Sequence, residues 1–223
     1  METRTIERVR TADGAPGQVW YTSYGSNMHL DRLMHYIEGG RAPGAALAHP
    51  GCRDKRPPTA SVAVELPGVL YFATESRLWS GGRAFYDPDA DGRVYGRAHL
   101  VTAGQFSDIA AQEMYRAPGA DLDLVRAVRH GRAVLGDGRY ETLVSPGCLD
   151  GLPALTVTAP WSVGRVEWNA PSAAYLRYLS TGLLEAGARD VREIAAYLAA
   201  CPGAAGHWTV QRVVDLIAAP ATG

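Results

Sequence analysis

The hydrophobic and polar positions near the start of the chain predict a strand, a tight polar loop and a helix in direct succession. Residues 19–24 are rich in strand formers, and the run stops abruptly at the Gly-Ser-Asn of residues 25–27. From about Leu30 the apolar residues recur with helical spacing, and the expected helix ends at two glycines after Glu38. A glycine-containing loop before a helix is typical of anion binding, so a carboxylate or an oxyanion would fit there. An ordinary turn with a helix N-cap is the alternative.

Strand patterns dominate the rest of the first two thirds of the chain. Six segments have the β-branched, aromatic and alternating character of strands: 61–66, 68–73, 83–86, 93–101, 138–144 and 152–158. Turn residues predict that the first two are joined at Pro67-Gly68, that the next two form a hairpin, and that the last two pair around residues 148–151. The turn of the middle hairpin resembles a calcium loop, but Ala98 occupies the position where a bidentate glutamate is needed.

Helical spacing returns in four later segments: 102–114, 171–185, 190–200 and 209–217. Thr102 is the expected N-cap of the first of them. Glu113 lies near its C-terminal end, where the helix dipole tends to raise the pKa of a carboxyl group, and this unfavourable position singles Glu113 out. A solvated surface glutamate is the alternative. Strands in hairpins with helices inserted and appended predict an α+β fold, and barrel closure would remove the sheet edges.

The composition fits one domain with one sizeable core. The chain has 223 residues, of which 47% are hydrophobic. We expect a single domain over 17–223, with a strand-rich core over about 17–168, a helical part over about 170–218 and an N-terminal extension over 1–16.

Charge and cysteine content exclude several classes of partner and cofactor. The 22 Lys and Arg residues nearly balance 23 Asp and Glu, giving a net charge of −1, so neither nucleic acid nor an anionic membrane is an expected partner. No apolar run is long enough to span a membrane, and the first residues lack a hydrophobic signal region, which predicts a cytoplasmic protein. Three widely spaced cysteines and scattered histidines predict reduced thiols and no metal. The sequence has no glycine-rich phosphate loop and no dinucleotide fingerprint, so no cofactor is expected. The oligomeric state is open.

Four motifs together resemble the gamma-glutamylcyclotransferase-like family over about residues 19–187. In the order of the family they are Tyr24-Gly25-Ser26-Asn27, then Trp79-Ser80-Gly81-Gly82-Arg83-Ala84, then Val94-Tyr95-Gly96 with a helix ending at Gln112-Glu113, and finally Leu149-Asp150-Gly151-Leu152-Pro153 leading into Pro171-Ser172-Ala173-Ala174-Tyr175. The ordered set is more specific than any one motif. This chain departs from the family at Thr22-Ser23, where an aromatic and a small residue are common, so one wall of the pocket is expected to be more polar.

The resemblance implies a small mixed, mostly antiparallel β-barrel flanked by helices, with C-terminal helices. It also implies that Glu113 is the only catalytic acid/base residue and that the loop after the first long strand holds the substrate. The candidate substrate-binding residues are Tyr24, Gly25, Ser26, Asn27, Trp79, Gly82, Tyr115 and Tyr175.

The implied substrate is a small γ-glutamyl amine or peptide, cleaved without metal by a cyclotransferase, which acts as a lyase. The α-amine of such a substrate can attack its own γ-carbonyl, and such orientation supplies effective molarities of about 10⁵ M or more. The products are 5-oxoproline and a free amine, whose contacts would come from the variable segment 41–67. Two alternatives remain: a same-fold amidase or acyltransferase that acts on another acyl amide, for instance in a biosynthetic pathway, or a non-catalytic binder of small ligands.

Overall fold

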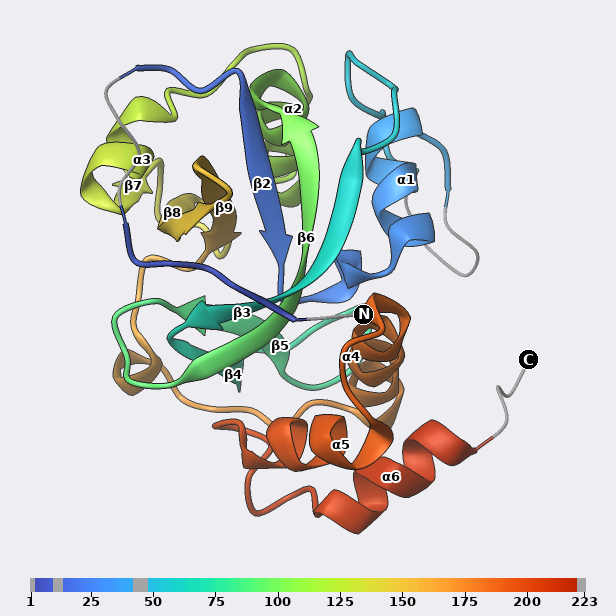
Figure 1. Ribbon diagram of the computed structural model, residues 1–223. Coiled ribbons are helices and arrows are strands. Elements are labelled where there is room, and N and C mark those ends of the chain that lie inside the picture. Colours follow the sequence, from blue (N-terminus) through green and yellow to red (C-terminus); the bar gives the residue numbers. More distant parts are fainter. Residues whose placement is uncertain (1–2, 10–13, 42–47, 220–223) are drawn as a thin grey trace.

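A twisted seven-stranded sheet forms the centre of the computed structural model, which describes residues 3–9, 14–41 and 48–219 (Figure 1). The strand order is β1-β3-β6-β2-β9-β8-β7, and β4 and β5 form a separate two-stranded sheet. The strands are β1 (Arg4–Thr5), β2 (Gln18–Ser23), β3 (Ala60–Pro67), β4 (Val69–Ala73), β5 (Arg83–Asp87), β6 (Arg93–Thr102), β7 (Arg132–Val134), β8 (Thr142–Leu149) and β9 (Leu152–Thr158).

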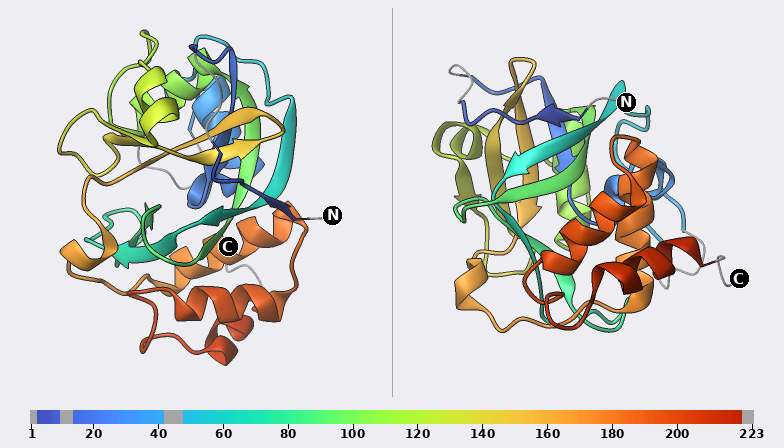
Figure 2. Two further views of the ribbon diagram at one scale, coloured as in Figure 1. Left: turned by 60° about the vertical axis from the view of Figure 1, so that its left-hand side comes forward. Right: turned by 60° about the horizontal axis from the view of Figure 1, so that its bottom comes forward.

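Helices cover the sheet and one end of the molecule. They are α1 (Leu30–Glu38), α2 (Ala103–Glu113), α3 (Val125–His130), α4 (Ala173–Ala186), α5 (Val191–Ala200) and α6 (Val210–Ala218), with short 3₁₀ helices η1 (Ser26–Met28) and η2 (Val163–Arg165). The last three pack together at one end (Figure 2). None of the helices in the described ranges has the length and apolar content needed to cross a membrane.

The predicted α+β class is confirmed, and most strand pairs are antiparallel. Only β1–β3 and β2–β9 are parallel among the ladders of the described residues. The ladder ends at β1 and β7 in this part of the chain, so hydrogen bonds between strands do not close it into a barrel. The described part of the expected N-terminal extension joins the sheet, because β1 pairs with β3 and Glu7 bridges to Cys148. Residues 1–2 and 10–13 of that extension, and residues 42–47 of the variable segment 41–67, lie outside the described ranges.

The predicted hairpin between residues 83–86 and 93–101 is wrong. Strand β5 pairs with β4, whereas β6 lies between β2 and β3 in the large sheet. The turn after β5 therefore carries the chain from one sheet to the other, as does the turn at Pro67-Gly68 between β3 and β4. The two turns touch: the Gly68 N–H donates to the Gly92 carbonyl over 3.1 Å. Turn residues show where a chain reverses, but they do not show which strand it then pairs with.

Predictions that rest on local signals are confirmed. Strands β8 and β9 pair around Asp150-Gly151. Helix α2 begins with a capping box between Thr102 and Gln105, and α4 ends at Gly187 in the left-handed conformation. The short elements α3 and β7 were not expected, because six and three residues are too few to show a period.

Strand β2 separates two hydrophobic clusters by the alternation of its side chains. Val19 and Tyr21 belong to a cluster that includes apolar residues of α1, α2 and α3. Trp20 and Tyr24 belong to another, which includes residues of α4 and α5. The strand is hydrogen-bonded to β6 on one side and β9 on the other. The loop that follows Ser23 therefore begins at the end of a central strand of the sheet.

Candidate active site

A cavity of about 50 Å³ lies where β2 leaves the sheet. It is lined by residues from β2, the following loop, the end of α2 and several strands: Tyr21, Ser23, Tyr24, Gly25, Ser26, Asn27, Ala84, Glu113, Tyr140, Thr156, Val157 and Tyr175. Six of these were candidate site residues in the sequence, namely Tyr24, Gly25, Ser26, Asn27, Glu113 and Tyr175. The fold thus brings the loop, the glutamate and one distant tyrosine to a single cavity.

The loop over residues 24–27 lines this cavity and has backbone donors that are unpaired in the described part of the chain. The carbonyl of Gly25 accepts from the N–H of Met28, the last residue of η1, and the carbonyl of Ser26 accepts from the N–H of His29, the C-cap of η1. The N–H groups of Gly25, Ser26 and Asn27 have no acceptor among the described residues. Gly25 is extended, with φ −116°, so no left-handed conformation requires glycine there. A Cβ on it would lie 3.9 Å from the Tyr175 hydroxyl, in ordinary contact.

Asn27 connects the loop to the candidate acid/base residue. Its Nδ2 donates to Glu113 Oε1 over 2.8 Å and to the Tyr21 hydroxyl over 3.1 Å. Asn27 is buried, and its Oδ1 has no hydrogen-bond partner in the described structure. The Asn27 side chain therefore fixes the position of the Glu113 carboxyl group, and its Oδ1 is an acceptor that a ligand could use.

The surroundings of Glu113 raise the pKa of its carboxyl group. Burial is the main cause, and the positive charge of Arg32 together with hydrogen bonds from Tyr36 and Asn27 offset part of it. The sequence had suggested the helix dipole as the cause. The tertiary structure adds desolvation, which depends on residues brought in from α1 and β2.

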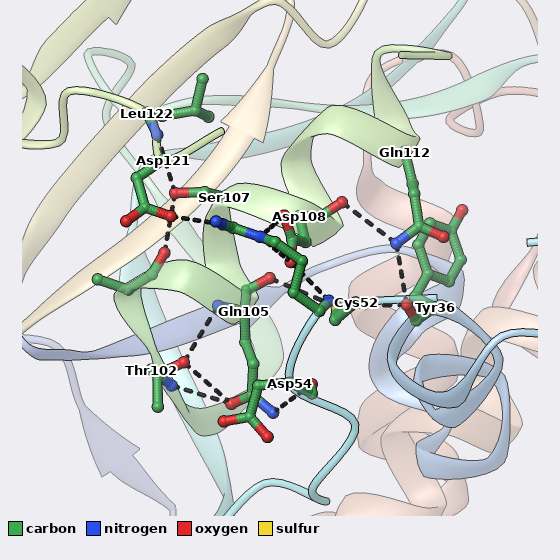
Figure 3. A network of polar contacts seen from close by, with 12 residues as sticks. Tyr36, Cys52, Asp54, Thr102, Gln105, Ser107, Asp108, Gln112, Asp121 and Leu122 are labelled. Atoms are coloured by element: carbon green, nitrogen blue, oxygen red, sulfur yellow. Dashed lines mark hydrogen bonds and ion pairs between the residues drawn. The ribbon is translucent and has the colours of Figure 1, made fainter. Parts of the chain in front are cut away.

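Helix α2 is held against α1 and the segment after it by the polar network of Figure 3. The buried Asp108 carboxylate accepts from the Arg53 N–H over 2.8 Å and from Arg53 Nε over 3.0 Å. Near the end of the helix, Gln112 Nε2 donates to the Tyr36 carbonyl over 2.9 Å. Because both contacts lie within six residues of Glu113, they set where its carboxyl group stands relative to α1.

A buried histidine holds the backbone of the loop over residues 24–27. His99 on β6 contacts the Asn27 carbonyl through Nε2 at 3.2 Å and Ser61 Oγ through Nδ1 at 2.8 Å. Burial lowers the pKa of His99 to about 3, so the imidazole is neutral at pH 7. A carbonyl only accepts, so Nε2 carries the proton and Nδ1 accepts from Ser61. No motif points to this role, because His99 occupies one of many buried strand positions.

Two tyrosines of the cavity are neutral donors. Tyr24 donates its hydroxyl to the Val157 carbonyl over 2.7 Å. Burial raises the pKa of Tyr175 to about 12, and the pKa of Tyr24 is raised as well for the same reason. Of the two residues expected to make one wall of the pocket more polar, Ser23 lines the cavity and Thr22 does not. The Thr22 hydroxyl donates to the Leu155 carbonyl instead.

Three candidate residues lie outside the cavity lining, and their roles in substrate binding remain predictions. Trp79 stacks on the Tyr175 ring, with centroids 5.2 Å apart. Gly82 donates to the Ala170 carbonyl over 2.8 Å, and a Cβ on it would overlap the Asn169 carbonyl. Tyr115 follows α2 and is 73% exposed. Sequence reasoning missed five residues of the lining. Tyr21, Tyr140, Thr156 and Val157 belong to none of the four motifs, and Ala84 closes the second motif but was not a candidate. Strand alternation was the one available signal for Tyr21.

Comparisons with known proteins give partial matches. No protein-family model matches the chain. Histone deacetylase 5 from Arabidopsis thaliana is 32% identical over 221 residues, covering 89% of this chain, and the chain spans about a third (33%) of that relative's length. A solved gamma-glutamyl cyclotransferase aligns at 16% identity with a TM-score of 0.49, and an uncharacterized protein from Homo sapiens aligns at 17% with 0.47. Both alignments cover 90% of this chain and 98% of the other. Similarity at this level carries neither a reaction nor residue roles to this chain.

Proposed function

We propose that the chain cleaves γ-glutamyl amines or peptides by attack of the substrate's own α-amine, releasing 5-oxoproline and a free amine. The observation that supports this most is the 2.8 Å hydrogen bond from Asn27 to Glu113 at the wall of one cavity. A reaction whose nucleophile belongs to the substrate needs a proton carrier and donors for the oxyanion. A carboxyl group of raised pKa suits the first need, and the backbone N–H groups of residues 25–27 suit the second.

The proton balance requires a single carboxyl group. The α-ammonium gives one proton to Glu113, and the free amine then attacks the γ-carbonyl carbon. As the bond from that carbon to the departing nitrogen breaks, Glu113 returns its proton to the departing nitrogen. The second proton shed by the attacking nitrogen leaves with the product amine as its ammonium ion. In this proposal the α-ammonium donates a hydrogen bond to the buried Oδ1 of Asn27, which has no partner in the described residues.

The arrangement of the cavity disfavours a serine nucleophile. Of the two serines that line it, Ser26 accepts a hydrogen bond from Arg32 Nε over 2.9 Å. Neither Ser26 nor Ser23 contacts a histidine in the part of the chain that the structure describes, and a serine nucleophile needs a base within hydrogen-bond reach. An intramolecular nucleophile removes that need.

Incubation with a panel of γ-glutamyl amides and peptides, followed by mass spectrometry, tests the proposal. We expect at least one member of the panel to lose its acyl group as the cyclic lactam in equal amount to the amine released. Release of glutamate would identify a hydrolase of the same fold instead. Turnover of other acyl amides alone would identify another amidase or acyltransferase, and binding without turnover would identify a binding protein.

A further inference from the structure

Arg32 adjoins Ser26, which lines the cavity together with Glu113. It lies in the first turn of α1, and its Nε donates to Ser26 Oγ. Its guanidinium stands 6.0 Å from the centre of the Tyr36 ring and also contacts Tyr178. Its charge acts on Glu113, because it holds the pKa of that carboxyl lower than burial alone would. Arg32 is therefore a cation whose charge reaches the candidate acid/base residue and whose position is fixed by Ser26 of the loop.

The charge of Arg32 has no anionic partner in the described protein. No carboxylate in the described residues lies within 4.0 Å of its guanidinium nitrogens. Other partly buried arginines, such as Arg97 and Arg189, do form such pairs. Nε donates to Ser26, and beside the contact with Tyr178 the two terminal nitrogens carry further N–H groups that can donate to an incoming anion.

We propose that Arg32 binds the α-carboxylate of the substrate and so selects substrates in which that carboxylate is free. This rests on the proposed function, and the stereochemistry of the substrate links the two. The α-amine and the α-carboxylate share one carbon, so the groups that receive them must be neighbours. Glu113 receives the amine, and Arg32 is the cation beside Glu113. When the guanidinium binds the α-carboxylate, the α-ammonium of the substrate lies at Glu113. The side chain of the substrate then extends its γ-carbonyl toward residues 25–27.

A structural role for Arg32 predicts something different. If the guanidinium only braced Ser26 and α1, its removal would weaken every ligand of the cavity equally. If it binds the α-carboxylate, removal weakens only ligands that carry this charge. A charged hydrogen bond of this type corresponds to about tenfold to hundredfold in affinity.

The test compares two ligands that differ in one group: L-γ-glutamyl methylamide and the same compound with an α-carboxamide. Binding is measured by calorimetry in the full chain carrying Glu113→Gln, so that neither ligand is consumed. We expect the carboxylate to bind more tightly, and Arg32→Gln to weaken it about tenfold to hundredfold while leaving the carboxamide unchanged. Arg32→Lys should retain part of the preference, because it keeps the charge without the fork.

The matched control is Arg77→Gln, which removes an equal charge from an exposed position in the segment between β4 and β5. It should leave both affinities unchanged. Equal affinities for the two ligands before Arg32 is changed, no binding of either, or an equal loss for both in Arg32→Gln would each overturn the proposal. The reaction is tested separately: a protein that shows the expected binding pattern but releases no 5-oxoproline retains the carboxylate site and lacks the proposed activity.

Discussion

Asn27 and Glu113 are 86 positions apart in the chain, and Asn27 Nδ2 donates to Glu113 Oε1 over 2.8 Å. The two side chains come from the loop after the central strand and from the last residue of α2. His99 holds the backbone of Asn27 from β6, and Tyr21 receives the second hydrogen bond of the amide. Contacts from three elements hold this pair in place. A conservative substitution at either residue should therefore change proton transfer without unfolding the protein.

Replacement of Glu113 by glutamine should abolish turnover without unfolding the protein. Glutamine has nearly the same size and can still accept from Asn27, but it cannot carry the proton. We expect kcat on a γ-glutamyl amide to fall by at least about 10²-fold, the usual scale of general acid/base catalysis. Glu38→Gln, at an exposed position of α1, is the matched control and should keep full activity. Circular dichroism checks the fold, and unchanged turnover in Glu113→Gln would rule out the mechanism.

Replacement of Asn27 by alanine should shift the pH dependence of the reaction. The amide of Asn27 lowers the pKa of Glu113, so its loss raises that pKa further. Glu113 must be ionised to accept the first proton, and the rising limb of kcat/KM against pH should therefore move to higher pH. Initial rates over a pH series measure the shift. A lower rate at all pH values with an unmoved limb would show that Asn27 acts on substrate binding alone.

The stability of the protein should fall with rising pH because of Glu113. Its folded-state pKa is raised above the unfolded value of about 4.3. The folded state therefore binds the proton more tightly, and this contribution is fully present below the unfolded pKa and is lost as pH rises through the folded one. Urea unfolding of the wild type and Glu113→Gln should show a difference that grows in favour of the variant over this window. Parallel stability curves would contradict the raised pKa.

Replacement of Gly82 by alanine should destabilise the fold through a steric clash. A Cβ at this position would overlap the Asn169 carbonyl, and both backbones would have to move. Overpacking of this kind costs about 1–3 kcal/mol of the free energy of unfolding. Gly17→Ala is the control, since no atom lies within 4 Å of its added Cβ. Equal unfolding midpoints for the two variants would mean that the segment around residue 82 adapts at little cost.

Local chemistry explains which elements could be predicted from the sequence. The cap at Thr102, the stop at Gly187 and the turn at Asp150-Gly151 each depend on residues within a few positions of one another. The hairpin predicted around residues 87–92 failed, because pairing of β5 with β4 and of β6 with two other strands depends on contacts between distant segments. The same limit applies to closure of the sheet into a barrel.

The sequence by itself determined the α+β class, the polar loop at residues 24–27 and the presence of a carboxylate at the end of a helix. Only the tertiary structure decided that the two meet, that burial raises the pKa of Glu113, and that Arg32 stands beside them. Tyr140 entered the cavity from a segment without any motif. The physical reason is that a motif is a property of neighbours in the chain, whereas desolvation and charge depend on every group within several ångströms, whatever its position in the sequence.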